Sequence, residues 1–189
     1  MTAKLIYVAT RSLDGYIEDA QGKIDWTSPG EEGHLFVNDL LRPVCTYLYG
    51  RRMYETMQVW KEFGTSASDP PSARDFAAVW KAAEKIVYSK TLKHVSTPNT
   101  RLEQTFDVDA IREMKSRATR DIGIGGHELA AHAFQAGLVD ELYLFIAPVL
   151  IGGGKTSFPE GVRVGLELVN ERRFPENGVV HLHYRVRTA

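Results

Sequence analysis

Strand-like and helix-like segments alternate along most of this chain. Runs rich in β-branched and aromatic residues predict strands at residues 4–9, 46–49, 85–89, 101–104, 121–124, 141–148, 166–174 and 179–187. Runs with helical spacing of apolar residues predict helices at 33–41, 51–60, 73–82, 108–116 and 128–136. This alternation favours an α/β fold, in which helices cover both faces of a largely parallel sheet.

The last two predicted strands are separated by a turn signal. The turn reads Pro175-Glu176-Asn177-Gly178, and Asn-Gly favours a hairpin. An antiparallel hairpin is therefore expected to close the sheet.

Length and composition narrow the class of protein. A chain of 189 residues fits one domain, residues 1–189, and a net charge of -1 gives no general attraction to nucleic acid. Cys45 is the only cysteine, which excludes an intrachain disulfide and a cysteine-based metal site. Neither a signal peptide nor a membrane span is readable, so we expect no membrane association and a cytoplasmic location. His181 and His183 share one strand face but lack an evident third ligand, so no metal site is expected.

A glycine-rich turn joins a predicted strand to a predicted helix. Residues 122–126 read Ile-Gly-Ile-Gly-Gly, and the helix that follows ends before Gly137. Such a turn leaves backbone N–H groups free to bind phosphate, although close packing alone would also explain the glycines. A dinucleotide fingerprint is excluded by Glu128, and a Walker-type loop by Val149, because each stands where glycine is required.

The order of several short motifs resembles the dihydrofolate-reductase-like superfamily. Within it, the chain is most similar to the reductase (C-terminal) domain of the bifunctional riboflavin-biosynthesis deaminase–reductase and its free-standing relatives. The motifs that carry this resemblance lie at residues 12–17, 25–26, 50–55, 122–126, 137–142 and 147–154, the last followed by Phe158. The resemblance implies a three-layer α/β/α dihydrofolate-reductase-like fold with about eight strands, and a homodimer.

The resemblance also implies a site for NADPH at the C-terminal edge of the sheet. The residues it assigns to this cofactor are Thr10 and Ile17 beside the nicotinamide; Gly50, Arg51, Arg52 and Met53 at the phosphates; Ser89 and Lys90 near the adenine ribose; Gly125, Gly126, His127, Glu128 and Leu129 at the pyrophosphate; and Thr156. The chemistry of two of these residues independently supports a phosphate site. Basic side chains at a helix start oppose the helix dipole, so Arg51 and Arg52 indicate an anionic partner, unless they are merely solvated.

Two acids are candidates for the proton donor of a reduction. Glu31 falls where the dihydrofolate reductases place an acid, at the start of the helix after the tryptophan, and Asp25 lies beside Trp26. A structural alternative is that Glu31 and Glu32 complement the dipole of this helix.

The resemblance therefore implies an NADPH-dependent reductase. It would transfer hydride to a C=N or C=O bond of a small heterocyclic substrate, similar to a pyrimidine or pteridine, as in riboflavin biosynthesis. No zinc-binding set that would supply a deaminase is present, so a different heterocycle or a xenobiotic carbonyl stays open as substrate. The alternatives are dihydrofolate reduction, which depends on Glu31, and a non-catalytic NADP-binding protein.

Overall fold

The central sheet places the strands out of chain order. The computed structural model describes residues 3–187, in which eight strands follow the order β5-β4-β3-β6-β1-β7-β10-β9. Their bounds are β1 (Leu5–Ser12), β3 (Thr46–Gly50), β4 (Glu84–Tyr88), β5 (Thr100–Glu103), β6 (Ile122–Gly125), β7 (Glu141–Ala147), β9 (Leu166–Arg173) and β10 (Val180–Val186). Neighbouring strands are parallel except where β10 pairs with β7 and β9. The mostly parallel sheet with a C-terminal antiparallel hairpin is therefore confirmed.

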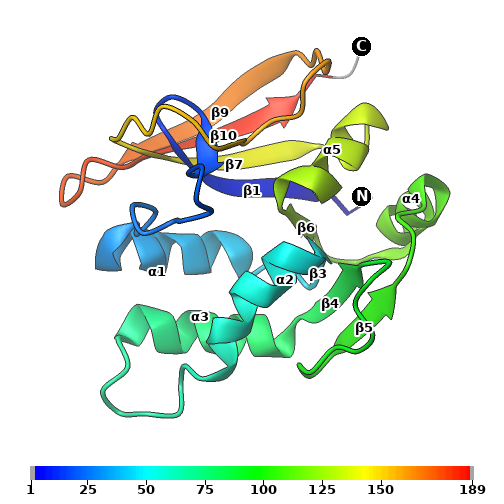
Figure 1. Cartoon of the computed structure of the whole chain (residues 1–189), viewed down its shortest axis with the longest axis horizontal. Coiled ribbons are helices and arrows are strands. Elements are labelled where there is room, and N and C mark those ends of the chain that lie inside the picture. Colours follow the sequence, from blue (N-terminus) through cyan, green and yellow to red (C-terminus); the bar gives the residue numbers. More distant parts are fainter. Residues whose placement is uncertain (1–2, 188–189) are drawn as a thin grey trace.

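Helices cover both faces of this sheet, which confirms the three-layer arrangement (Figure 1). On one face, α1 (Gly30–Leu41) and α3 (Pro71–Ala82) pack against the sheet through side chains that include Leu41, Phe76 and Trp80. On the other face lie α4 (Val108–Arg117) and α5 (His127–Gln135), which bury Ile111 and Phe134. Burial of these large side chains is the main source of stability for each layer.

Local sequence signals fix several element ends. Asp107 caps α4 by accepting hydrogen bonds from the backbone N–H groups of Asp109 and Ala110, at 2.9 and 3.2 Å. Gly137 follows α5 with a φ of 63°, a conformation that glycine adopts without strain. Within residues 3–187, no helix combines the length and the apolar character needed to cross a membrane.

Three details differ from the sequence prediction. Helix α1 begins at Gly30, before the predicted start at residue 33, because its first turn contacts α3. The predicted helix 51–60 is divided into α2 (Arg51–Met57) and a 3-10 helix, η1 (Gln58–Lys61). Two short strands, β2 (Tyr16–Glu18) and β8 (Lys155–Thr156), form a separate antiparallel pair. Strands of two or three residues are too short to show an alternating pattern in the sequence.

Candidate functional site

The C-terminal ends of β3 and β6 lie side by side and lead into two helices. Tyr49 of β3 is in register with Gly125 of β6, and the chain then enters α2 and α5. From there α2 leads to α3 on one face of the sheet, whereas α5 packs on the other face. Adjacent strands whose connections leave to opposite faces form a crevice at their carboxyl ends, which is where α/β sheets bind ligands.

Both helix starts at this edge are without a side-chain cap. Gly50 is the N-cap residue of α2 and Gly126 is that of α5, and no described side chain accepts a hydrogen bond from either first turn. The first N–H groups of a helix have no partner inside the helix. The edge therefore offers free donors and the positive end of the α5 dipole to an anion.

The glycines of this turn also allow close packing. A Cβ atom at Gly125 would lie 3.3 Å from Cε of Met53, and one at Gly126 would lie 3.2 Å from Cβ of Met53. Gly126 has a φ of 89°, which side chains rarely tolerate. The turn thus needs glycine both for its backbone conformation and for its contact with α2.

Two arginines border the turn, and their ion pairs are weak. Nε of Arg51 lies 3.3 Å from the carboxylate of Glu55, and an Nη1 donor of Arg51 lies 3.2 Å from the hydroxyl of Thr91. Arg52 is 71% exposed, and its guanidinium lies 3.9 Å from the carboxylate of Glu128. Exposed pairs of this kind contribute about 0–1 kcal/mol, so either guanidinium can turn to a bound anion at little cost.

The residues predicted near the adenine ribose lie next to Arg51. The buried hydroxyl of Ser89 accepts hydrogen bonds from the N–H groups of Thr91 and Leu92, at 3.2 and 3.0 Å, and so shapes the turn after β4. The neighbouring side chain of Lys90 is exposed. The hydroxyl of Thr91 also accepts a hydrogen bond from Arg51, and this contact joins the start of α2 to the turn after β4.

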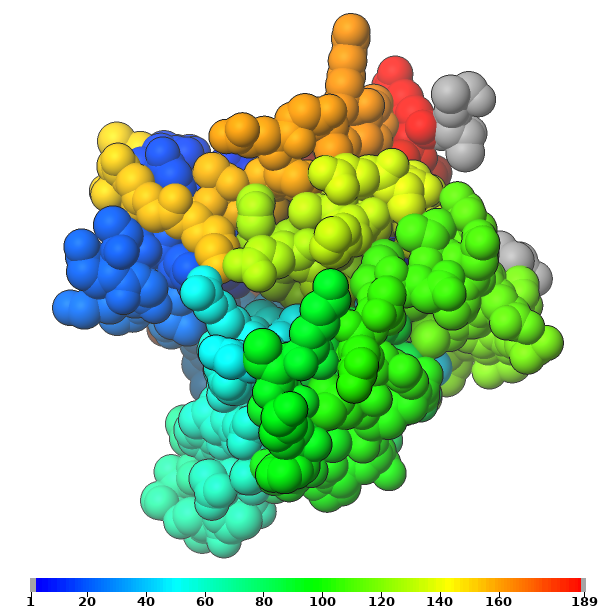
Figure 2. All heavy atoms as spheres, turned by 45° about the vertical axis from the view of Figure 1, so that its right-hand side comes forward, coloured from blue at the N-terminus to red at the C-terminus, as the bar shows by residue number. Residues whose placement is uncertain are grey.

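Residues 12–19 and 148–157, which we call the flap, form one side of the same edge. Asp14 accepts hydrogen bonds from the N–H groups of Ile151 and Gly152, and β2 pairs with β8. Figure 2 shows residues 150–157 (gold) beside the start of α5 (yellow-green) and close to α2 (cyan), with a recess between α2 and the blue loop before α1. Salt bridges from Lys155 to Glu18 and Glu128 agree with this arrangement.

Other predicted cofactor residues differ in how they are placed. Thr10 is half-buried near the end of β1. Ile17 is half-buried and packs against the core cluster that includes side chains of α5. Thr156 donates its hydroxyl to the carbonyl of Phe158 at 2.9 Å, so this group is already engaged. His127 opens α5 with a buried Nδ1 that has no partner among the described residues, whereas Leu129 is buried in the core and supports the helix.

The contacts of Glu31 conflict with its predicted role as proton donor. Its carboxylate accepts hydrogen bonds from the hydroxyl and the backbone N–H of Ser72, at 2.6 and 3.0 Å, and thereby caps α3. These hydrogen bonds hold the pKa of Glu31 below its usual value, whereas a proton donor at neutral pH needs a raised pKa. The carboxylate of Glu31 therefore supports the first turn of α3, whereas the structural alternative had it support only its own helix, α1. Asp25 lies exposed in the loop before α1.

Sequence reasoning did not select Lys155, which lies between the flap and α5. The lysine directly follows the glycine run Gly152-Gly153-Gly154. In the structure, Gly154 has a φ of 132° and packs so closely on the backbone of Glu18 that any side chain would clash. The glycine run therefore fixes the position of Lys155, and a lysine directly after it was the available signal.

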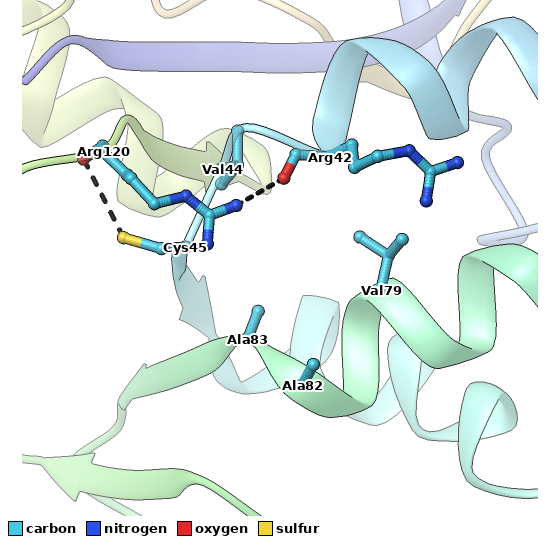
Figure 3. Close-up of a pocket in the computed structure, with 7 residues that line it drawn as sticks. All are labelled: Arg42, Val44, Cys45, Val79, Ala82, Ala83 and Arg120. Carbon is cyan, nitrogen blue, oxygen red and sulfur yellow. Dashed lines mark hydrogen bonds between the residues drawn. The ribbon is translucent and has the colours of Figure 1, made fainter.

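A second hollow lies at the opposite edge of the sheet, where β3 begins. It measures about 230 Å³ and is lined by residues that include Arg42, Cys45, Val79 and Arg120 (Figure 3). Arg120 donates to the carbonyls of Arg42 and Pro43, and Arg42 pairs with Asp75. The two arginines of this hollow are thus engaged within the fold. The hollow also lies away from the carboxyl ends of the strands, where α/β sheets bind ligands, so it is not the candidate site.

Comparison with known proteins identifies the family of this chain. Residues 3–180 match the model of the RibD C-terminal domain, and the chain belongs to this family. A curated relative is the uncharacterized protein YyaP of Bacillus subtilis (strain 168), 29% identical over 175 residues that cover 92% of this chain and 89% of YyaP.

Three solved structures share the fold. One is a putative riboflavin biosynthesis protein from Shewanella sp. PV-4, with a TM-score of 0.75, 21% identity and full coverage of both chains. A second is a diaminohydroxyphosphoribosylaminopyrimidine deaminase/5-amino-6-(5-phosphoribosylamino)uracil reductase from Thermotoga maritima, with a TM-score of 0.68 and 16% identity over 98% of this chain and 57% of that one. The third is dihydrofolate reductase from Enterococcus faecalis with NADP(H), with a TM-score of 0.64, 15% identity and full coverage of both chains. The dihydrofolate-reductase-like fold is therefore confirmed.

Proposed function

We propose that this protein is an NADPH-dependent reductase that transfers hydride to a C=N or C=O bond of a small pyrimidine- or pteridine-like heterocycle. Membership of the RibD C-terminal domain family supports an oxidoreductase. The observation that carries the proposal is the pair of uncapped helix starts, after Gly50 and Gly126, beside the exposed Arg51 and Arg52. This arrangement suits an elongated ligand with several phosphate groups.

The proposal gives each part of the edge a task. NADPH supplies the hydride when bound. The first N–H groups of α5 and the cations near them hold its phosphates, since free donors and positive charge favour an anion there. Gly126 leaves room for that approach because it carries no Cβ. The flap, joined to α5 through Lys155, limits access of water to the recess.

The proposal concerns the source of the proton as well, and of the two acids suggested by the sequence it excludes Glu31. Because Glu31 is bound to Ser72 and its pKa is lowered, we propose that water, or Asp25 through water, supplies the proton. The same contact removes the main support for dihydrofolate as the physiological substrate, which depended on an acid at residue 31.

The substrate class is tested by following NADPH oxidation with a panel of heterocycles. The panel contains 5-amino-6-(5-phosphoribosylamino)uracil, its dephosphorylated form, dihydrofolate and simple carbonyl compounds. We expect turnover with at least one pyrimidine and little with dihydrofolate. NADPH binding without oxidation in the presence of any pyrimidine, pteridine or carbonyl compound would instead support the non-catalytic alternative.

A further inference from the structure

Four charged side chains meet where the flap reaches α5. Nζ of Lys155 lies 3.4 Å from the carboxylate of Glu18 on β2 and 3.3 Å from that of Glu128 in the first turn of α5. The same Glu128 oxygen lies 3.9 Å from the guanidinium of Arg52. Lys155 is only 21% exposed, whereas Glu128 is 75% exposed. The lysine is therefore enclosed by its surroundings, whereas the carboxylate of Glu128 lies in solvent.

The backbone fixes Lys155 at this position. It is in register with Glu18 in the β2–β8 pair, and Gly154 before it packs directly on the backbone of Glu18. Nζ of Lys155 is thus positioned by the flap, close to the start of α5. Such a compact ammonium group suits contact with a phosphate.

Charge balance shows what this cluster does in the free protein. Two carboxylates, Glu18 and Glu128, face two cations, Lys155 and Arg52, so the cluster has no net charge. An incoming anion gains attraction only when Glu128 releases these cations, since a carboxylate near a phosphate is repelled. Glu128 thus competes with the ligand for Lys155.

We infer that Lys155 is a further cofactor-binding residue. We also infer that Glu128, which the resemblance assigns to the pyrophosphate, instead weakens cofactor binding by competing for Lys155. The inference rests on the proposed function, because it assumes that the dinucleotide phosphates occupy this edge. On binding, the ammonium of Lys155 exchanges the carboxylate of Glu128 for a phosphate oxygen and keeps its contact with Glu18. The exposed position of Glu128 makes this exchange inexpensive.

The inference predicts opposite effects for the two partners. Lys155→Met removes a charge-assisted contact and weakens NADPH binding by about tenfold to a hundredfold, whereas Lys155→Arg retains most of the affinity. Glu128→Gln removes the competitor and strengthens binding by about two- to fivefold. If the cluster only held the flap against α5 and did not contact the cofactor, both Lys155→Met and Glu128→Gln would weaken NADPH binding. The direction of the Glu128→Gln effect therefore separates the two roles.

The experiment is a calorimetric titration of each full-length variant with NADPH, repeated at higher salt. Glu113→Gln is the matched control, because Glu113 pairs with Arg117 on the exposed surface of α4 and should leave affinity unchanged. Thermal unfolding without ligand shows that each variant is folded. Weaker binding by Lys155→Met, tighter binding by Glu128→Gln and a smaller salt effect for Lys155→Met support the inference.

The results that overturn it are distinct from failure of the proposed function. If the parent protein binds NADPH but Lys155→Met binds equally well, Lys155 does not contact the cofactor. If Glu128→Gln binds more weakly than the parent, Glu128 does not compete. If the folded parent protein binds no NADPH, the proposed function and this inference fail together.

Discussion

His181 of β10 is buried without a hydrogen-bond partner on either ring nitrogen among the described residues. Its ring lies between aromatic rings, with centroids 5.0 Å from Phe36 and 4.8 Å from Phe145. Burial, with smaller contributions from the charges of His183 and Arg172, lowers the pKa of His181 from 6.5 to about 4. The folded protein therefore holds this imidazole neutral at a cost in stability.

Replacing His181 with leucine should stabilise the fold, increasingly so at acid pH. At neutral pH the gain is about 1 kcal/mol, because two buried unpaired nitrogens are removed. Between pH 6.5 and about 4 the unfolded chain binds a proton at His181 that the folded parent does not, so stability of the parent falls as pH falls. The difference should grow by about 3 kcal/mol over that range. Urea unfolding across this pH range measures it, and parallel pH curves for parent and variant would refute the argument.

At the scale of elements, the contact between α1 and α3 decides what Glu31 does. Asn38 donates to the carbonyl of Ser72 and to the carboxylate of Asp75, both at 2.9 Å, and Glu31 accepts the two hydrogen bonds from Ser72. The two helices are thus joined through the first turn of α3.

Ser72→Ala should lower the free energy of unfolding by about 1.5 kcal/mol, because the hydroxyl donates to a charged group. For a chain of this size this corresponds to a fall of about 3–6 °C in the midpoint of thermal unfolding. Glu31→Gln should also lower the midpoint but leave the acid limb of the pH–rate profile in place. Loss of that limb with unchanged stability would restore Glu31 as the proton donor.

These elements also show which features of the structure could be predicted from the sequence and which could not. The strands of the sheet and the helices α3, α4 and α5 have clear periodicity, and capping residues such as Asp107 are local, so their positions could be predicted. The partner of Glu31 is 41 residues away in the chain, and no local pattern reveals it. Lys155 belongs to a two-residue strand whose partner, Glu18, lies on a strand almost as short, so its place could be found only in three dimensions.

At the scale of the whole molecule, one edge of the sheet collects the polar and glycine-rich segments. The ends of β3, β4 and β6, the flap and the start of α5 meet there, although they are distant in sequence (Figures 1 and 2). Arg51 lies at the part of this edge next to the turn after β4. Under the proposed function, its guanidinium recognises the 2′-phosphate on the adenosine of NADPH.

Arg51→Ala should therefore change the choice between cofactors. Loss of a charge-assisted hydrogen bond should weaken NADPH binding by about tenfold to a hundredfold and leave NADH binding nearly unchanged. Added salt should also weaken NADPH binding more than NADH binding. Parallel titrations with both cofactors provide the measurement. Equal losses for the two, or no loss for either, would show that Arg51 merely faces solvent.

The most direct test of the central claim is thermal unfolding of the unaltered protein with NADPH and with NADH. A ligand at about a hundred times its dissociation constant stabilises the folded state by about 2.7 kcal/mol, which shifts the midpoint by several degrees. We predict a concentration-dependent rise with NADPH and a smaller one with NADH at the same concentration. An unchanged midpoint at millimolar NADPH would contradict the assignment of this edge as an NADPH site.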